Sequence, residues 1–144
     1  MPVLEELELK GNKLTSLLED IPQKFYNQIL FNLKHVDLSQ NQLTEVPEFL
    51  GYLPRLRVVF LPFNKITNID ILFHETLENL EILDISNNKI KTLNDDIIKL
   101  ISLEHLNLEY NDMTSIPTII GFLPAMKNLN VYGNPLKNIR NEVV

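Results

Sequence analysis

The chain of 144 residues contains no cysteine and no tryptophan, and it has only four glycines. Without cysteine, neither a disulfide framework nor a thiolate metal site can form, and the composition favours a reducing compartment. We therefore expect a cytoplasmic location. No apolar run approaches the roughly 18 residues of a membrane span, and the charged start MPVLEELELK does not resemble a signal peptide, so no membrane partner is expected.

The sequence also lacks an excess of basic residues. It has 13 lysines and arginines against 19 aspartates and glutamates, a formal net charge of -6, and its basic residues are scattered. A nucleic-acid-binding protein would need a clustered basic surface, so a nucleic-acid partner is not expected. With 44% hydrophobic and 22% charged residues, the composition is that of an ordinary folded domain, and we predict a single domain over residues 1–144.

One phrase returns six times along the chain. It reads LEELELKGNKL from Leu4 and LEHLNLEYNDM from Leu103, and the six copies begin near residues 4, 33, 56, 80, 103 and 126. An asparagine holds the same place in each copy, at spacings of 29, 23, 24, 23 and 23 residues. Self-similarity at this period is the sequence sign of a solenoid.

The shared frame is L-x-x-L-x-L-x-x-N-x-L, and its x-L-x-L-x centre alternates as a strand with one buried face does. We predict an α/β solenoid whose six strands form one parallel concave sheet, with short helical or 3-10 legs on the convex side. Where the chain turns inward after each strand, it leaves buried backbone groups without partners, and an asparagine carries both a donor and an acceptor to satisfy them. The predicted asparagine ladder is Asn12, Asn41, Asn64, Asn88, Asn111 and Asn134.

The return legs are also patterned. TEVPEFLGYLPRL from Thr44 and TSIPTIIGFLPAM from Thr114 predict short helical or 3-10 turns, with Gly51 and Gly121 in a left-handed or tight turn after them. The first leg carries six extra residues. Its apolar residues recur at intervals of four, at Ile21, Phe25, Ile29 and Leu33, and together with Pro22 they predict a helix of about three turns on the outer surface.

The repeated frame resembles that of leucine-rich repeats, and the resemblance covers essentially the whole chain. The IPxxIGxLP leg is similar to that of cytosolic leucine-rich-repeat-only proteins, the Ras-suppressor-like type, and the closing GNPLKNIRNEVV resembles the family of leucine-rich-repeat-containing protein forty. The resemblance implies a right-handed coil curved into a horseshoe, whose concave face binds partner proteins without catalysis. The phosphatase-regulator type is an alternative, although its repeats of 22 residues usually lack this leg.

Both ends depart from complete family members. No capping helix precedes the strand expected at Leu4, and no polar cap follows the last repeat before Val144. Caps shield the ends of a solenoid core. We therefore expect a fragment of a larger protein, with incomplete terminal caps and a tendency to associate end to end through Leu4 to Leu9.

The predicted partner-binding face consists of the residues between the buried strand leucines and in the turn that follows. An apolar group there is not required by the repeat frame, so it indicates an anchor for a protein partner, ringed by polar groups. The candidate residues are Val58, Phe60, Phe63, Ile82, Asp84, His105, Tyr110 and Tyr132. In the alternative interpretation, Phe63 folds against Phe60 and Pro62 to cover its own repeat, and Val58 and Ile82 pack as cross-strand neighbours.

No catalytic, cofactor or metal site is expected. His35 and His105 share a face but lie three strands apart, about 14 Å, so they cannot bind one metal ion. His105 and Asp84 together resemble a base and its orienter, but a positioned nucleophile is missing. The alternative to a partner-binding module is a structural spacer within a larger multidomain protein.

Overall fold

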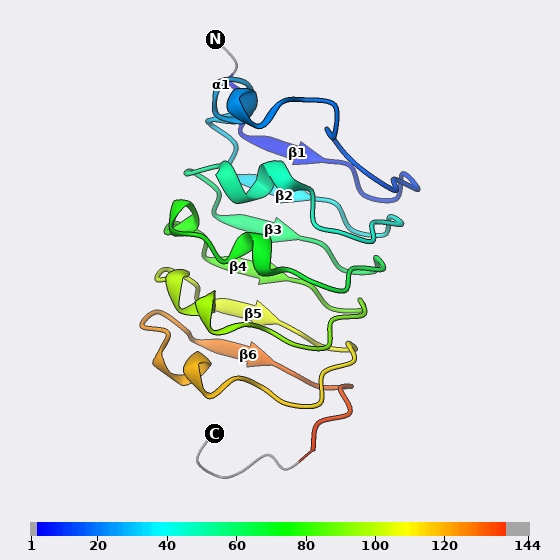
Figure 1. Ribbon diagram of the computed structural model, residues 1–144, viewed down its shortest axis with the longest axis vertical. Coiled ribbons are helices and arrows are strands. Elements are labelled where there is room, and N and C mark those ends of the chain that lie inside the picture. Colours follow the sequence, from blue (N-terminus) through cyan, green and yellow to red (C-terminus); the bar gives the residue numbers. More distant parts are fainter. Residues whose placement is uncertain (1–2, 138–144) are drawn as a thin grey trace.

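The computed structural model describes residues 3–137, which form a solenoid of six coils (Figure 1). Each coil contributes one short strand to a single parallel sheet, in the order β1 to β6. The strands are β1 Glu6–Glu8, β2 His35–Asp37, β3 Val58–Phe60, β4 Ile82–Asp84, β5 His105–Asn107 and β6 Asn128–Asn130. The predicted fold class is therefore confirmed.

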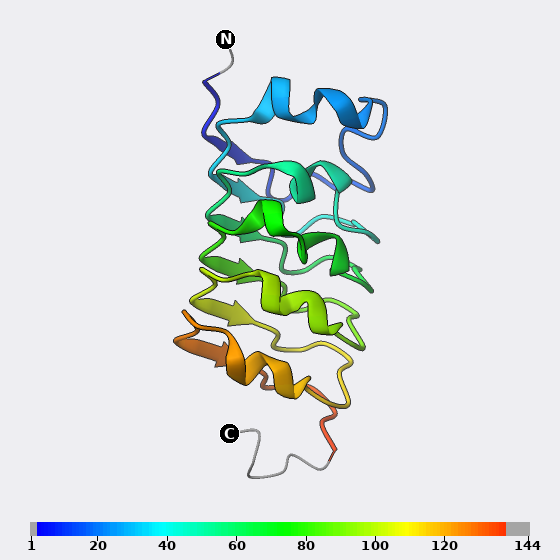
Figure 2. The same ribbon diagram turned by 60° about the vertical axis from the view of Figure 1, so that its left-hand side comes forward.

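The return legs lie together on one side of the sheet, where short helices stack from coil to coil (Figures 1 and 2). Proline directly precedes three of them, at Pro22, Pro47 and Pro117, where a missing N-H costs nothing. Asn94 caps another by accepting a hydrogen bond from the amide of Asp96. The helices are η1 Gln23–Phe25, α1 Tyr26–Leu30, η2 Glu48–Tyr52, η3 Asp70–Leu72, η4 Glu75–Leu77, η5 Asp95–Lys99 and η6 Thr118–Phe122.

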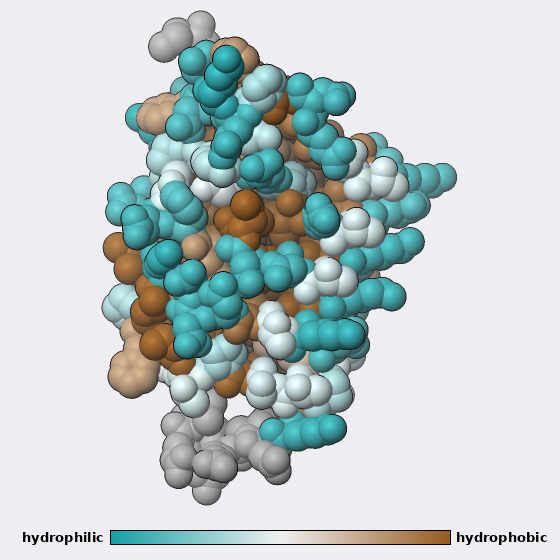
Figure 3. Space-filling view, viewed as in Figure 1, coloured by the Kyte–Doolittle hydropathy of each residue, from teal (hydrophilic) through white to brown (hydrophobic). Residues whose placement is uncertain are grey.

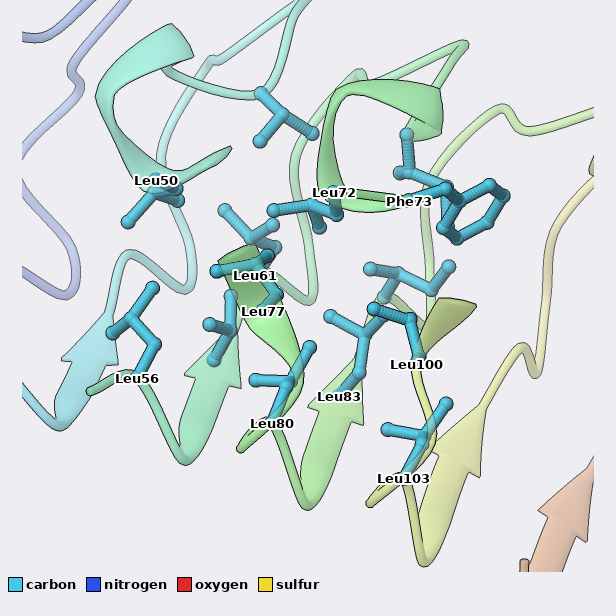
Figure 4. Close-up of a cluster of buried hydrophobic side chains, with 14 of the residues drawn as sticks. Leu50, Leu56, Leu61, Leu72, Phe73, Leu77, Leu80, Leu83, Leu100 and Leu103 are labelled. Atoms are coloured by element: carbon cyan, nitrogen blue, oxygen red, sulfur yellow. The ribbon is translucent and has the colours of Figure 1, made fainter. Parts of the chain in front are cut away.

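The core fills the space between the sheet and the legs. The middle residue of each inner strand, such as Val59 in β3 and Leu83 in β4, points into this space and is fully buried. Leucines from the legs meet the strand leucines there, as Leu72 and Leu100 do in Figure 4. Because the middle residues face the core, the two residues flanking each of them must face the other way.

The predicted length of the helix in the first leg was wrong. Together η1 and α1 span residues 23–30, about two turns instead of three, and their buried residues are Tyr26 and Leu30. The aromatic ring of Tyr26 lies 6.2 Å from that of Phe49, in an edge-on arrangement in the core. This aromatic contact between neighbouring legs fixes the rotation of the helix, and it leaves Phe25 and Ile29 exposed.

The role predicted for Gly51 was also wrong. Gly51 lies within η2 and does not have a positive φ. A Cβ atom added there would lie 2.7 Å from the carbonyl oxygen of Ile71 in the next coil. The glycine therefore permits two legs to approach closely. Gly121 has no positive φ and no such neighbour, and the structure gives no reason for it.

Candidate partner-binding face

The chain turns inward after every strand through one residue in the left-handed conformation. Their φ angles lie between 53° and 77°, and the six residues are Gly11, Gln40, Phe63, Asn87, Tyr110 and Gly133. Only glycine adopts this conformation without cost, and bulky side chains are rare there. Two of the six positions nevertheless hold aromatic residues, Phe63 and Tyr110.

From the second coil onward, the asparagine after each left-handed residue joins its own turn to the preceding coil. In the third coil, the Oδ1 atom of Asn64 accepts a hydrogen bond from the amide of Leu43 at 3.0 Å, and its Nδ2 atom donates to the carbonyls of Leu38 and Leu61. The inner four asparagines repeat this pattern and are buried. At the first coil, the exposed Asn12 side chain donates to the carbonyls of Leu9 and Lys10 in its own turn.

The face of the sheet opposite the legs is hereafter the open face, formed by the first and third residue of each strand. In the four inner strands these residues are half-buried, whereas the middle residue is fully buried. The strand register aligns His35, Val58, Ile82 and His105 in one row. Two aliphatic side chains at the centre are therefore flanked by two imidazoles.

Phe60 lies in the second row of the open face, between Asp37 and Asp84 on the neighbouring strands. Its ring centroid is 5.4 Å from that of His35, with the ring planes at 84°. This edge-to-face arrangement of the two rings is favourable. Phe63 does not fold down to cover its repeat, because 55% of its surface is exposed. Val58 and Ile82 do pair across strands, as the alternative interpretation predicted.

A hollow of about 250 Å³ opens on this face between β3 and β6. Four of the predicted partner-binding residues line it together, namely Phe60, Ile82, Asp84 and His105. Val58 lies beside the hollow in the row of Ile82 but is not part of its lining. The wall also includes Leu83 and Leu106 of the strands and three asparagines, Asn107, Asn128 and Asn130. These asparagines were not singled out in the sequence, because a polar residue on an exposed strand face carries no signal of its own.

The remaining predicted residues lie at the edge where the strands end. Tyr110 and Tyr132 come from successive coils, and their rings meet edge to face with centroids 5.5 Å apart and planes at 83°. Their exposed fractions are 50% and 70%. We call these two residues the tyrosine pair. Hydrophilic side chains also project from this edge, at the right of Figure 3, beside the turns seen at the right of Figure 1.

The histidine and aspartate that resemble a catalytic pair are not joined by a hydrogen bond. The register places Asp84 beside Asn107, whose Nδ2 atom is 3.5 Å from the Oδ2 atom of Asp84. The Nδ1 atom of His105 instead lies 2.8 Å from the side-chain nitrogen of Asn128. Within residues 3–137, no three acidic, histidine or cysteine side chains gather where they could hold a metal ion. None of the helices in that range has the length and apolarity required to cross a membrane.

Comparison with known proteins identifies the repeat. A family profile described as leucine rich repeat matches residues 54–113 and 78–136, and a second, for two copies of the repeat, matches residues 31–74. The chain belongs to the leucine-rich-repeat family. Modules of this family generally mediate interactions between proteins, through the extended surfaces that stacked repeats create.

Individual relatives share this leucine-rich-repeat segment. The chain is similar to adenylate cyclase of Schizosaccharomyces pombe, with 28% identity over 137 residues, 94% of this chain and 8% of the cyclase. Among solved structures, a leucine-rich-repeat protein of Leptospira interrogans is 34% identical with a TM-score of 0.81, covering 94% of this chain and 33% of that one. The plant peptide hormone receptor RGFR1, solved in complex with RGF2, is 29% identical with a TM-score of 0.74, covering 92% and 21%.

The leucine-rich-repeat chain thus spans a small part of each of these relatives. They include an enzyme and a receptor, so the similarity extends to the repeat and does not distinguish a subtype of the family. The prediction of incomplete terminal caps concerns both ends of the chain, of which residues 1–2 and 138–144 lie outside the described residues. At the first coil, Leu7 is only partly buried, whereas its counterparts Val36 and Val59 are fully buried.

Proposed function

We propose that this leucine-rich-repeat chain is a non-enzymatic module of the cytosolic type that binds a partner protein through its open face. The observation that carries the proposal is the position of Val58, Phe60 and Ile82 on β3 and β4. They lie on the side of the sheet away from the legs, and they are half-buried in a fold whose leucine frame does not need them there. The lack of cysteine supports a cytoplasmic location.

The surroundings of these residues fit a binding centre. Asparagine occupies both open-face positions of β6, and glutamate occupies both in β1, so the apolar group is confined to the middle of the sheet. Protein interfaces commonly combine an apolar or aromatic centre with a polar rim that excludes water. Phe63, exposed at the end of β3, extends the apolar group toward the turns.

Affinity capture tests this function when the unchanged protein is compared with its Phe60→Ser and Ile82→Ser variants. We expect proteins that are captured reproducibly by the unchanged chain to be lost from both variants, because each substitution removes apolar contact area at the centre of the face. Phe122→Ser is the matched control. Phe122 is 74% exposed and belongs to the leg side, in η6, so its substitution should leave capture unchanged.

Thermal unfolding must accompany this comparison. Because Phe60 is only half-buried, its replacement should lower the melting temperature by only a few degrees, on the order of 1 kcal/mol. If capture is lost equally with Phe122→Ser, the open face is not the binding surface. If Phe60→Ser unfolds the domain, Phe60 serves the core instead of a partner.

The alternative is a spacer role within a longer protein. It is favoured by one observation, that the chain corresponds to only 8% of the length of the cyclase it resembles. A spacer needs no partner on its open face. In that case the Phe60→Ser and Ile82→Ser variants of the full encoded protein would keep every partner and every activity of the unchanged protein.

A further inference from the structure

We propose that the partner presents a lysine- or arginine-rich segment with an apolar side chain to the open face. The apolar side chain enters the hollow beside Phe60 and Ile82, and the cations meet the carboxylates around it. This inference rests on the proposed function and names the chemistry of the partner. It comes from the distribution of charge on the two sides of each strand.

The open face and the turns that follow it carry carboxylates without partner cations. Between each strand and its ladder asparagine the described turns hold one lysine, Lys10 in the first coil; Lys13, Lys65 and Lys89 follow the asparagines, farther from the sheet along the chain. None of the five carboxylates forms an ion pair within the described residues; they are Glu6, Glu8, Asp37, Asp84 and Glu109. An array of one sign attracts a segment of the opposite sign and steers its approach.

The residues just before the strands show the opposite arrangement. There, every carboxylate pairs with a cation of the adjacent coil: Glu5 with Lys34 at 3.0 Å, Glu81 with Arg57 at 2.9 Å and Glu104 with Lys127 at 3.0 Å. The same stacking would allow such pairs on the open face, because residues of adjacent coils face each other in both places. The sequence instead leaves the open-face charge unbalanced, so a partner can balance it.

Asp84 is the carboxylate best placed to meet a cation beside the hollow. Its Oδ1 atom accepts a hydrogen bond from the amide of Ser86 at 2.9 Å, which fixes the orientation of the carboxylate. Its Oδ2 atom has only the distant contact of 3.5 Å with Asn107. A carboxylate oxygen with unused acceptor capacity in a partly enclosed site favours a lysine or arginine donor.

The tyrosine pair offers a second contact for a cation. Tyr110 directly follows Glu109, and the two exposed rings of the pair are held in place by each other. Cations bind favourably over aromatic faces, and a neighbouring carboxylate adds to the attraction. An apolar anchor in the hollow and a cation at the tyrosine pair would therefore place one segment of the partner across β4, β5 and β6.

Three labelled synthetic peptides of about ten residues test the charge and the anchor separately by fluorescence anisotropy. One combines lysine with leucine, one lysine with serine, and one glutamate with leucine. We expect the lysine–leucine peptide to bind the unchanged protein at low salt, about tenfold more tightly than the lysine–serine peptide, and to weaken as salt is raised. The glutamate–leucine peptide should not bind. Equal binding of the two leucine peptides would overturn the proposal.

Two double variants with the same change in net charge test the location. Asp84→Asn with Glu109→Gln removes two carboxylates from the open face, and Glu45→Gln with Glu78→Gln removes two exposed ones that form no ion pair in the described residues. Binding of the lysine–leucine peptide should weaken about tenfold in the first variant and less than twofold in the second. Equal weakening in both would show diffuse attraction to an acidic protein and would sink the assignment.

The outcomes separate this inference from the proposed function. If capture of natural partners depends on Phe60 while no lysine peptide binds, the open face is a protein-binding surface but its partner is not basic. If the lysine–leucine peptide binds and Phe60→Ser does not weaken it, the apolar anchor is wrong. If the Phe60→Ser variant still captures the same proteins and still binds the peptide, both the proposed function and this inference are rejected.

Discussion

The Oδ1 atom of Asn88 accepts a hydrogen bond from the backbone amide of Ile66 at 3.0 Å, across the boundary between two coils. Its Nδ2 atom donates to the carbonyl of Leu61 in the preceding coil and to that of Ile85 in its own. One buried side chain therefore satisfies the Ile66 amide, and it shares the two carbonyls with the neighbouring ladder residues Asn64 and Asn111. Stability and stacking depend on the same atoms.

We predict that Asn88→Ala lowers the free energy of unfolding by about 2 kcal/mol, because the buried Ile66 amide loses its partner and the carbonyls of Leu61 and Ile85 each lose one of two donors. Asn12→Ala is the matched control, since the exposed Asn12 side chain donates to carbonyls of its own turn and the backbone amide that bonds Asn41 is kept, and it should cost less than about 1 kcal/mol. Urea unfolding followed by circular dichroism measures both. Equal losses in the two variants would mean that the asparagines act only as turn residues.

The strands and the asparagine positions could be predicted because the repeat itself displays them. Six copies of an apolar alternation leave few alternatives for the buried face, and a polar residue at a fixed place in that frame must satisfy buried groups. The clustering of Phe60, Ile82, Asp84 and His105 around one hollow follows from the in-register stacking of the strands. Its asparagine wall could not be predicted, because the frame does not constrain those positions.

The first leg shows the limit of periodicity. Intervals of four residues fit both Phe25 with Ile29 and Tyr26 with Leu30, so apolar spacing alone does not determine which pair is buried. The contact between Tyr26 and Phe49 decides it, and that contact joins residues 23 positions apart. A long-range contact of this kind leaves no trace in the local sequence.

Burial raises the pKa of the Tyr26 hydroxyl above its usual value of 10.0, and the nearby Glu48 carboxylate and Tyr52 add to the shift. The unfolded chain therefore loses this proton at a lower pH than the folded chain. The resulting contribution to stability is intact below about pH 10 and is lost as the pH rises through the folded-state pKa. The stability difference between the unchanged protein and Tyr26→Phe should be constant from pH 7 to 9 and change above pH 10. A constant difference up to pH 11 would contradict the raised pKa.

Phe63 holds a left-handed conformation, with φ of 59°, that a bulky side chain adopts only at a cost. Two substitutions separate this strain from the contacts of the ring. Phe63→Ala keeps the strain and removes the ring, whereas Phe63→Gly removes both. We predict that the glycine variant is more stable than the alanine variant by about 1 kcal/mol, measured by thermal unfolding. If the alanine variant is the more stable of the two, the turn is not strained.

The left-handed turns of the first and last coils allow strain and contact to be distinguished in a second way. Gly11 and Gly133 have almost equal φ angles, 74° and 77°. A Cβ atom at Gly11 would meet no atom within 4 Å, whereas one at Gly133 would lie 2.5 Å from the Tyr110 ring. Gly133 thus provides the surface on which the Tyr110 ring of the tyrosine pair lies.

We predict that Gly133→Ala costs more stability than Gly11→Ala by about 1–2 kcal/mol, because both substitutions introduce backbone strain but only the first displaces a ring. In the Tyr110→Ala background the two glycine substitutions should cost nearly the same, since the clash has gone. Urea unfolding of the four variants and the two parents completes this thermodynamic cycle. If Gly133→Ala remains the more costly substitution without the Tyr110 ring, the close contact with that ring does not cause the difference. The two tyrosine rings are then held in place by each other alone.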